Sequence, residues 1–368
     1  MTFSDLDLDF DFPPDSMVVE SELIDPLDPT DIDDFFGIPV YVTPNAANFT
    51  STACATQRKL IYTGPSPYSG HAIDGFLKCP QYWVLKYGIK DLTWQNEAES
   101  DTSPALVMGT MGHQGLGLYY RRMQAVQEGQ NPEEWATPIE GVRALACKGG
   151  LYLSSLSTVI EGIKQYLTRY EHNEAFTVLG VDGDGASMLI GEIDGVDIDG
   201  VTPVKFKISR GADIVVQSKR DGKIYVFDHK WVGNIKPQTL LRYAGDGQFL
   251  DYQWIGKQIW GEKFGGVILN LAAWPNNNGV VKFYRNSIGT APFGVATRVA
   301  NLRYELEHRA RLLVRRGRLN IIHWPKKQTE HVCQGPYRMC AAFEVCTQGT
   351  TAKMEYNEEK MNDWLGRS

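Results

Sequence analysis

The chain has 368 residues, of which 43% are hydrophobic, 11% aromatic and 22% charged. Such a composition is typical of a folded globular protein, and it excludes a wholly disordered chain, a collagen-like repeat and a coiled coil. The sequence holds no run of 18 apolar residues, so we expect no membrane span. Its acidic start lacks the basic and apolar segments of a secretory signal. We therefore expect a cytoplasmic protein whose cysteines are reduced.

Charge is divided unevenly along the chain. Residues 1–57 carry twelve acidic residues and no Lys or Arg, which leaves residues 58–368 with 37 basic and 32 acidic residues, a net charge of +5. We interpret residues 1–57 as an acidic disordered tail, because like charges repel and little apolar area can be buried there. The segment 308–327 holds five Arg, two Lys and no acidic residue. This stripe, which includes Arg315 and Arg316, suits contacts with a phosphate backbone, and a solvated helix face is the alternative.

The hydrophobic spacing predicts an alternation of helices and short strands. Helices are expected at 69–88 (interrupted at Cys79-Pro80), 105–128, 151–171, 247–262 and 296–316, the last closed by Gly317. Strands are expected at 176–180, 188–193, 204–208, 213–217, 224–228, 267–274 and 280–284, with a loop after Trp231. Four glycines in the second helix, Gly109, Gly112, Gly115 and Gly117, suggest close approach of a neighbour or a ligand. This order of elements predicts an α/β fold with a central mixed sheet and helices on both faces.

Two carboxylates and an ammonium group are expected to meet on one hairpin. Asp228 and Lys230 are two residues apart on a predicted strand, so their side chains project from the same face. Asp213 lies on the adjacent strand, and an imidazole such as that of His113 could complete a metal site. Carboxylate oxygens suit Mg²⁺ or Mn²⁺, and this arrangement serves metal-assisted phosphodiester hydrolysis. The alternative is surface charge on an amphipathic hairpin.

A second pair of polar residues follows on the next predicted helix. Gln248 and Tyr252 are four residues apart, so they share one helical face. Side chains of this kind can contact a nucleic acid backbone or base.

Cysteines gather near the C-terminus. Cys333, Cys340 and Cys346 fall within fourteen residues, and Cys79 is the best candidate for a fourth ligand. Four thiolates suit a tetrahedral zinc ion or a 4Fe–4S cluster. The alternative is a set of buried free cysteines.

The order of these motifs resembles the RecB-like branch of the PD-(D/E)XK nuclease superfamily, and within it the AddB-like and CRISPR-adaptation exonucleases with one cysteine before the core and three after it. The resemblance covers residues 66–346 and rests on six motifs. They are Phe76-x2-Cys79-Pro80-x-Tyr82, Gly109-Thr-x2-His113, Gly211-x-Asp213, Asp228-x-Lys230, Gln248-x3-Tyr252 and the three C-terminal cysteines.

The resemblance implies a role for each matching residue. His113, Asp213 and Asp228 would bind Mg²⁺ or Mn²⁺, and Lys230 would assist the attacking water. Gln248 and Tyr252 would support the site and contact DNA. Cys79, Cys333, Cys340 and Cys346 would hold a 4Fe–4S cluster. Two departures are Trp231, where the family more often has a small residue or Thr, and the wide spacing after Cys333, which leaves zinc open.

The resemblance also implies a domain plan. It predicts a restriction-endonuclease-like core within a nuclease domain at 58–346, an iron–sulfur subdomain formed by 66–100 and 318–346, and a C-terminal tail at 347–368.

The function implied is that of a metal-dependent DNA exonuclease or end-processing nuclease in recombination, repair or phage replication. The alternative is a non-cleaving iron–sulfur or zinc-stapled DNA-binding protein. Expected partners are single-stranded DNA or DNA ends and a recombination or replication protein docked on the acidic tail. A helicase would be a separate partner, because the chain has no G-x4-G-K-[ST] loop. The expected location is the cytoplasm of a bacterial or phage-infected cell. Polarity, strand preference and exo- versus endonuclease action stay open.

Overall fold

The computed structural model describes a defined part of the chain. It covers residues 58–61, 70–88, 104–149, 153–171, 175–197, 199–275, 279–288, 292–315 and 324–327, together with residues 333, 340, 342 and 346. Contacts divide the chain into two units, Met1–Ala55 and Thr56–Ser368, and the described residues all belong to the second. The predicted tails at 1–57 and 347–368 lie outside the described residues, as do Arg316 and Gly317.

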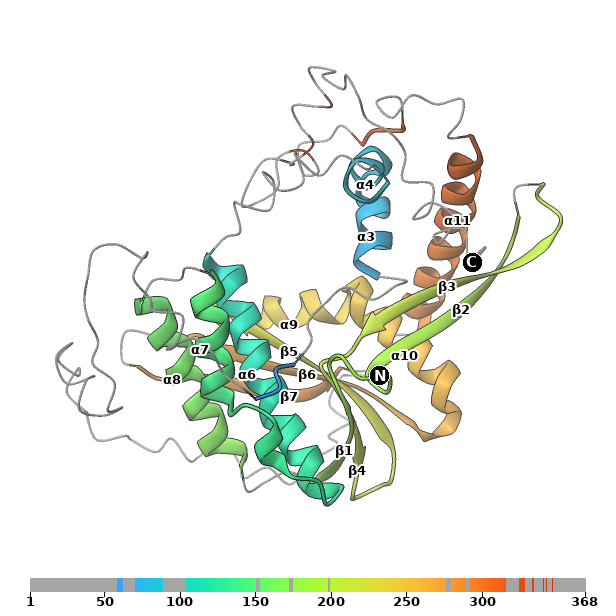
Figure 1. The fold of residues 1–368 in the computed structure, drawn as a ribbon. Coiled ribbons are helices and arrows are strands. Elements are labelled where there is room, and N and C mark those ends of the chain that lie inside the picture. The colour runs from blue at the N-terminus through green and yellow to red at the C-terminus, as the bar shows by residue number, and fades with distance from the viewer. Residues whose placement is uncertain are drawn as a thin grey trace. The chain divides into compact units, whose positions relative to one another are not determined.

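The described helices and strands follow the order expected of an α/β protein (Figure 1). In chain order they are α3 (Gly70–Lys78), α4 (Pro80–Tyr87), α6 (Pro104–Gln127), η2 (Pro132–Glu134), α7 (Pro138–Gly149), α8 (Leu153–Tyr170), β1 (Phe176–Val181), β2 (Met188–Val196), β3 (Pro203–Gly211), β4 (Ile214–Ser218), β5 (Ile224–Val232), α9 (Pro237–Ala244), α10 (Gly247–Trp260), η3 (Gly261–Lys263), β6 (Phe264–Ala273), β7 (Phe283–Ile288) and α11 (Pro292–Arg315).

Five strands form a mixed sheet in the order β1-β4-β5-β6-β7. Only β5 and β6 are parallel, and α9 and α10 make the crossover between them, whereas the other neighbours are antiparallel. The strands β2 and β3 pair with each other as a separate two-stranded ribbon. The predicted mixed sheet is therefore confirmed. The β2–β3 ribbon lies between β1 and β4 in the sequence, although β1 and β4 pair with each other in the sheet.

Helices cover both faces of the sheet. Successive side chains of β5 point to opposite faces. His229 stacks on Tyr120 of α6, with ring centroids 5.5 Å apart. On the other face, Asp228 accepts a hydrogen bond of 3.1 Å from Gln248 of α10. Helices α6, α7 and α8 pack together on the first face (Figure 1). Helix α10 covers the second face, and α11 packs against α10.

The break between α3 and α4 follows directly from the sequence. Cys79 has extended backbone angles and is the N-cap of α4, and Pro80 stands at the first helical position. Proline has no backbone N–H and its ring blocks the continuation of a preceding helix, so it ends α3 and suits the start of α4. The predicted interruption at Cys79-Pro80 is confirmed.

Three of the four glycines of α6 allow a neighbour to approach closely. A Cβ on Gly112 would lie 2.2 Å from Nε1 of Trp231, one on Gly115 would lie 2.8 Å from Ile163, and one on Gly117 would lie 3.3 Å from Ile61. These distances leave no room for a methyl group without a shift of the neighbour. The predicted close approach is therefore confirmed for three glycines. For Gly109, no atom of the described residues lies within 4 Å of the Cβ position.

One prediction of secondary structure was wrong, and one helix was missed. Residues after Trp231 were expected to form a loop, but Pro237–Ala244 is the helix α9. Its signal is Pro237 at the first helical position, which the surrounding glycines obscured. The helix α7 was not predicted either, although Thr137 and Glu140 form reciprocal hydrogen bonds of 2.7 and 3.3 Å at its start, the arrangement of a capping box.

Across the described residues, no helix combines the length and the apolar character that crossing a membrane requires.

Candidate active site

The candidate site forms where β5 extends past its neighbour β4. Pairing between the two strands runs from Gln217–Ile224 to Ile214–Phe227, so β5 continues beyond the last pair from Asp228 to Val232. Asp213 precedes β4, and the chain before it departs into the β2–β3 ribbon. This divergence opens the edge of β5, so that side chains from α6 and α10 can reach it.

His113 and Asp213 meet at this opening across 100 positions of sequence. His113 Nδ1 lies 3.1 Å from Oδ1 of Asp213. A carboxylate can only accept, so the imidazole donates from Nδ1. Burial would lower the pKa of His113, but the charge of Asp213 and the hydrogen bond to it raise that pKa. The other carboxylate oxygen, Oδ2, accepts a hydrogen bond from the backbone N–H of His229. Asp213 is thereby held between α6 and β5.

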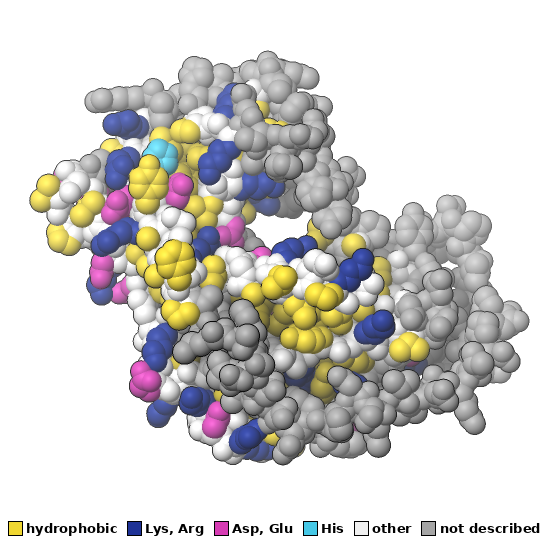
Figure 2. All heavy atoms as spheres, turned by 180° about the vertical axis from the view of Figure 1, so that it is seen from behind, with side chains coloured by type: hydrophobic (Ala, Val, Ile, Leu, Met, Phe, Trp, Pro, Cys, Tyr) yellow, Lys and Arg dark blue, Asp and Glu magenta, His cyan; other side chains and the backbone are white. Residues whose placement is uncertain are grey.

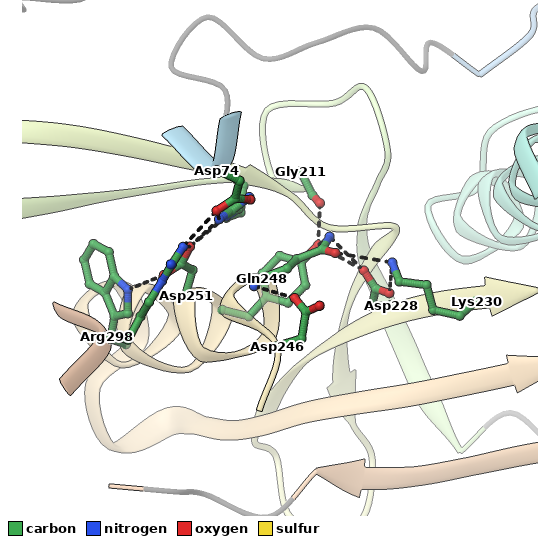
Figure 3. Close-up of polar contacts among 11 residues, drawn as sticks. Asp74, Gly211, Asp228, Lys230, Asp246, Gln248, Asp251 and Arg298 are labelled. Atoms are coloured by element: carbon green, nitrogen blue, oxygen red, sulfur yellow. Dashed lines mark hydrogen bonds and ion pairs between the residues drawn. The ribbon is translucent and has the colours of Figure 1, made fainter. Parts of the chain in front are cut away.

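Asp228, Lys230 and Gln248, labelled in Figure 3, form the second half of the site together with Tyr252. Lys230 is ion-paired with Oδ2 of Asp228. Gln248 donates to Oδ1 of Asp228 at 3.1 Å and to the Tyr252 hydroxyl at 2.7 Å, and its Oε1 lies 3.4 Å from Nζ of Lys230. The Tyr252 hydroxyl also lies 2.6 Å from the Gly211 carbonyl and 3.2 Å from Oδ1 of Asp228. The predicted i, i+4 pair therefore acts as one unit on Asp228.

The N-terminus of α10 fixes the position of Gln248. Asp246 is the N-cap of the helix, and its Oδ1 accepts a hydrogen bond of 2.8 Å from the backbone N–H of Gln248. Such a cap satisfies one of the N–H groups that a helix start leaves without a partner. The first turn of α10 therefore presents the Gln248 side chain to β5.

The two aspartates sit in different electrostatic environments. Burial alone would raise the pKa of Asp213, but the nearby imidazole of His113 holds it far below its usual value. For Asp228, burial raises the pKa and the charge of Asp213 adds to this, whereas Lys230 opposes it. Burial would lower the pKa of Lys230, but the charges of both aspartates raise it. Each aspartate of the site therefore faces a group that opposes its negative charge, His113 beside Asp213 and Lys230 beside Asp228.

The donor atoms fit a hard divalent cation. Asp228 is 1% exposed, and its Oδ2 contacts the Lys230 ammonium without accepting a hydrogen bond of ordinary geometry. An imidazole nitrogen and carboxylate oxygens of this kind suit Mg²⁺ or Mn²⁺. Within the described ranges, however, no three His, Cys, Asp or Glu side chains are already arranged as a metal site. The metal therefore remains a prediction.

Asp182 is a further carboxylate at the site that the sequence did not identify. It directly follows β1, and its backbone N–H donates a hydrogen bond of 2.9 Å to the carbonyl of Asp213. Burial and the charge of Asp213 raise the pKa of Asp182 to about 7. The turn Asp182-Gly-Asp-Gly185 resembles many surface turns, so only the pairing of β1 with β4 reveals that it ends beside Asp213.

His229 supports the site from the other face of the sheet. Its Nδ1 lies 2.6 Å from the amide nitrogen of Asn270, and burial lowers its pKa to about 3. His229 is therefore neutral. Its side chain holds the strand against α6 and α8, whereas its backbone N–H holds Asp213.

The segment before the C-terminal cysteines packs against the two helices that flank Cys79. The backbone N–H of Gln81 donates to the Pro325 carbonyl at 3.0 Å, and the rings of Trp83 and Trp324 lie 5.9 Å apart. Lys326 donates from Nζ to the Cys346 carbonyl at 3.0 Å. These contacts join residues that precede the core to residues that follow it.

The four predicted cluster ligands are all reduced thiols. None of Cys79, Cys333, Cys340 and Cys346 forms a disulfide. The Cys340 N–H donates to the Cys333 carbonyl at 2.8 Å. Burial raises the pKa of the Cys340 thiol, and the thiols of Cys79 and Cys333 are near enough to add to the shift. The described residues show no iron–sulfur subdomain, and the cluster remains a prediction.

The predicted basic stripe is not one continuous surface. Arg309 is 5% exposed and lies over the ring of Trp83, 5.6 Å from its centroid. Burial lowers its pKa to about 10. Arg309 is therefore a packing residue, which corrects its inclusion in a phosphate-binding stripe. Arg315 is exposed at the end of α11. On the face shown in Figure 2, Lys and Arg side chains are scattered among hydrophobic and acidic ones.

No protein-family model and no curated protein matches this chain.

Proposed function

We propose that the protein is a metal-dependent DNA nuclease that hydrolyses phosphodiester bonds at DNA ends, with its active site at the open edge of β5. The observation that carries the proposal is the meeting of His113, Asp213, Asp228 and Lys230, from three separate segments, at one point. The Gln248 and Tyr252 contacts to Asp228 support it further, since they orient the carboxylate from α10.

The residues divide into three roles. His113, Asp213 and Asp228 would hold a divalent cation, and that cation supplies Lewis-acid stabilisation of charge on the phosphate. Lys230 orients the attacking water and balances negative charge on the phosphate oxygens. Gln248 holds both Asp228 and Lys230, so that their relative position does not depend on the substrate.

The reaction requires water to form a new P–O bond while the P–O bond to the leaving oxygen breaks. The water loses one proton and the leaving oxygen gains one, so no oxidant or further reactant is needed. The residues of the chain contribute by preorganisation. Gln248, which the N-cap of α10 holds in place, keeps the Asp228 carboxylate in position before charge develops.

One observation favours the alternative of a non-cleaving DNA-binding protein. Asp228 pairs directly with Lys230, and Asp213 pairs with His113, so the charged groups satisfy one another. A site that binds a cation must exchange part of these pairings for metal ligation. Cleavage assays separate the two functions.

The experiment uses anaerobically purified full-length protein with end-labelled single- and double-stranded DNA, in Mg²⁺, Mn²⁺ or chelator. Asp228→Asn and Lys230→Met should lower cleavage by at least about a hundredfold, because each removes charge stabilisation at the phosphate. Asp221→Asn is the matched control, since it lies at the opposite end of the same hairpin. Cleavage that persists in Asp228→Asn, or that survives chelator, would overturn the proposal.

A further inference from the structure

Four charged side chains from four elements form a network beside the candidate site, and Figure 3 labels three of them, Asp74, Asp251 and Arg298. Asp74 comes from α3, Arg210 from β3, Asp251 from α10 and Arg298 from α11. Arg210 binds both oxygens of Asp74 at 2.7 and 3.0 Å and donates from Nε to Asp251 at 2.9 Å. Arg298 donates to Asp251 at 2.9 Å and to Asp74 at 3.0 Å. We call these four residues the charge quartet.

The charge quartet is electrically neutral, and three of its four side chains are shielded from solvent. The side chain of Asp251 is 0% exposed, that of Arg210 is 3%, that of Arg298 is 13%, and only Asp74, at 41%, reaches the surface. Burial would raise the pKa of Asp74, but the two guanidinium groups hold it below its usual value. Buried charges of this kind are costly unless every partner is present, so loss of one member disturbs the others.

The charge quartet touches the site through two peptide units. Arg210 directly precedes Gly211, and Asp251 directly precedes Tyr252. The Tyr252 hydroxyl and the Gly211 carbonyl are joined by a hydrogen bond of 2.6 Å. The same hydroxyl lies 3.2 Å from Oδ1 of Asp228. The hydrogen bond between Tyr252 and Gly211 therefore joins two residues that each follow a member of the charge quartet in the chain.

Tyr252 has a single hydroxyl proton and two acceptors within reach. The shorter contact is to the Gly211 carbonyl, so the Tyr252 hydroxyl donates its hydrogen bond to that carbonyl. The hydroxyl oxygen accepts a hydrogen bond from Gln248. A shift of Gly211 away from α10 would free this proton for Asp228. The hydrogen bonding of Asp228 therefore depends on where β3 ends relative to α10.

Helix α3 is the first of these four elements in chain order. Its start is packed tightly against Arg210, because a Cβ on Gly70 would lie 2.3 Å from that guanidinium group. Its end leads directly to Cys79 and α4. Asp74 is thus the point at which the segment that carries Cys79 enters the charge quartet.

We propose that the charge quartet is the positioning device of the candidate active site when α3 is docked. It fixes Gly211 and Tyr252, and it positions Asp228 through Gln248, which donates hydrogen bonds to both Tyr252 and Asp228. Asp74 and Arg210 are positioning residues rather than catalytic ones, since their side chains bind other members of the charge quartet and act on Asp228 only through neighbouring residues. The kinetic consequence rests on the proposed nuclease function, whereas the structural consequence does not.

The test compares Asp74→Asn with Glu140→Gln in the full-length protein. Glu140 is the matched control, because it pairs with Arg58 at 3.1 Å and its side chain is 42% exposed, close to the 41% of Asp74. Asp74→Glu keeps the carboxylate and serves as the conservative rescue. Steady-state cleavage of end-labelled DNA in Mg²⁺ measures kcat and KM. Hydrogen–deuterium exchange of segments 205–216 and 246–258 measures order at β3 and α10 without reference to catalysis.

We expect Asp74→Asn to lower kcat about ten- to hundredfold with little change in the KM for DNA, because misplacement of a catalytic group affects the chemical step. Exchange should quicken in both segments. Asp74→Glu should recover part of both effects, and Glu140→Gln should show neither. If Asp74→Asn does not fold, Arg298→Lys repeats the test, since it keeps the charge but loses the forked hydrogen bonds.

The outcomes separate the two proposals. Wild-type protein that cleaves no DNA removes the proposed function, and the exchange measurement then still decides the positioning role. Wild-type kcat and exchange in the folded quartet variant would overturn the inference. Equal losses in Asp74→Asn and Glu140→Gln would overturn it too, because they would reflect a general loss of stability.

Discussion

Replacement of Asp182 with Asn should stabilise the metal-free protein above neutral pH. Asp182 lies beside Asp213, and burial together with the charge of that neighbour raises its pKa from 3.8 to about 7. The folded protein therefore holds a proton on Asp182 that the unfolded chain releases near pH 4. An asparagine keeps the size of the side chain and cannot ionise.

The magnitude follows from the linkage between protonation and folding. A carboxyl group whose pKa is raised on folding costs nothing below its unfolded pKa. Stability is then lost as the pH rises from about 4 to about 7, and the loss is complete above that. A shift of about three pKa units corresponds to roughly 4 kcal/mol at 1.36 kcal/mol per unit. Because Asp182 is only partly buried, this value is the upper bound of the gain expected for Asp182→Asn at pH 8.5.

Urea unfolding with chelator present, at pH 5 and pH 8.5, measures the effect. Asp182→Asn should raise the unfolding midpoint at pH 8.5 and change it much less at pH 5. Asp199→Asn is the control, because hydrogen bonds from Thr202 and Val201 lower the pKa of that carboxyl group, so its removal should stabilise at neither pH. An Asp182→Asn protein with no advantage at pH 8.5 would refute the electrostatic description of the site.

Three further predictions concern the packing, the cysteines and the acidic segment. Gly112→Ala should lower the free energy of unfolding in urea by about 1–3 kcal/mol, because its Cβ would lie 2.2 Å from Trp231. Gly109→Ala has room around it among the described residues and should stabilise α6 by about 1 kcal/mol. Equal effects of the two substitutions would contradict this packing. Anaerobically purified protein should contain iron or, less readily, zinc. Cys79→Ser should lower both its metal content and its thermal stability. Metal analysis that finds neither element would exclude the predicted four-cysteine site. Deletion of residues 1–57 should tighten DNA binding at low salt, with a difference that fades as salt rises, because that segment carries twelve acids and no bases. Equal DNA affinities of the full-length and truncated proteins at every salt concentration would point to a docking or inert role.

Local chemistry was enough to predict most elements and half of the site. The Asp228-x-Lys230 spacing puts both side chains on one face of a strand, and the Gln248-x3-Tyr252 spacing puts both on one face of a helix. These relations follow from the periods of 2 and 3.6 residues, which depend on the backbone alone. The same holds for the break at Cys79-Pro80, since proline acts on its own neighbours.

The rest depended on contacts between residues far apart in the chain. Whether His113 reaches Asp213, 100 positions later, is decided by the packing of α6 on the sheet, to which no local period refers. Asp182 joins the site only because β1 pairs with β4. Arg309 is a case in which the sequence predicted the wrong environment. Its charge suggested a solvated or phosphate-binding face, but the packing of α11 against Trp83 buries it. Burial and neighbouring charge are properties of the assembled core, so they fixed the pKa values and the charge quartet only once the elements had come together.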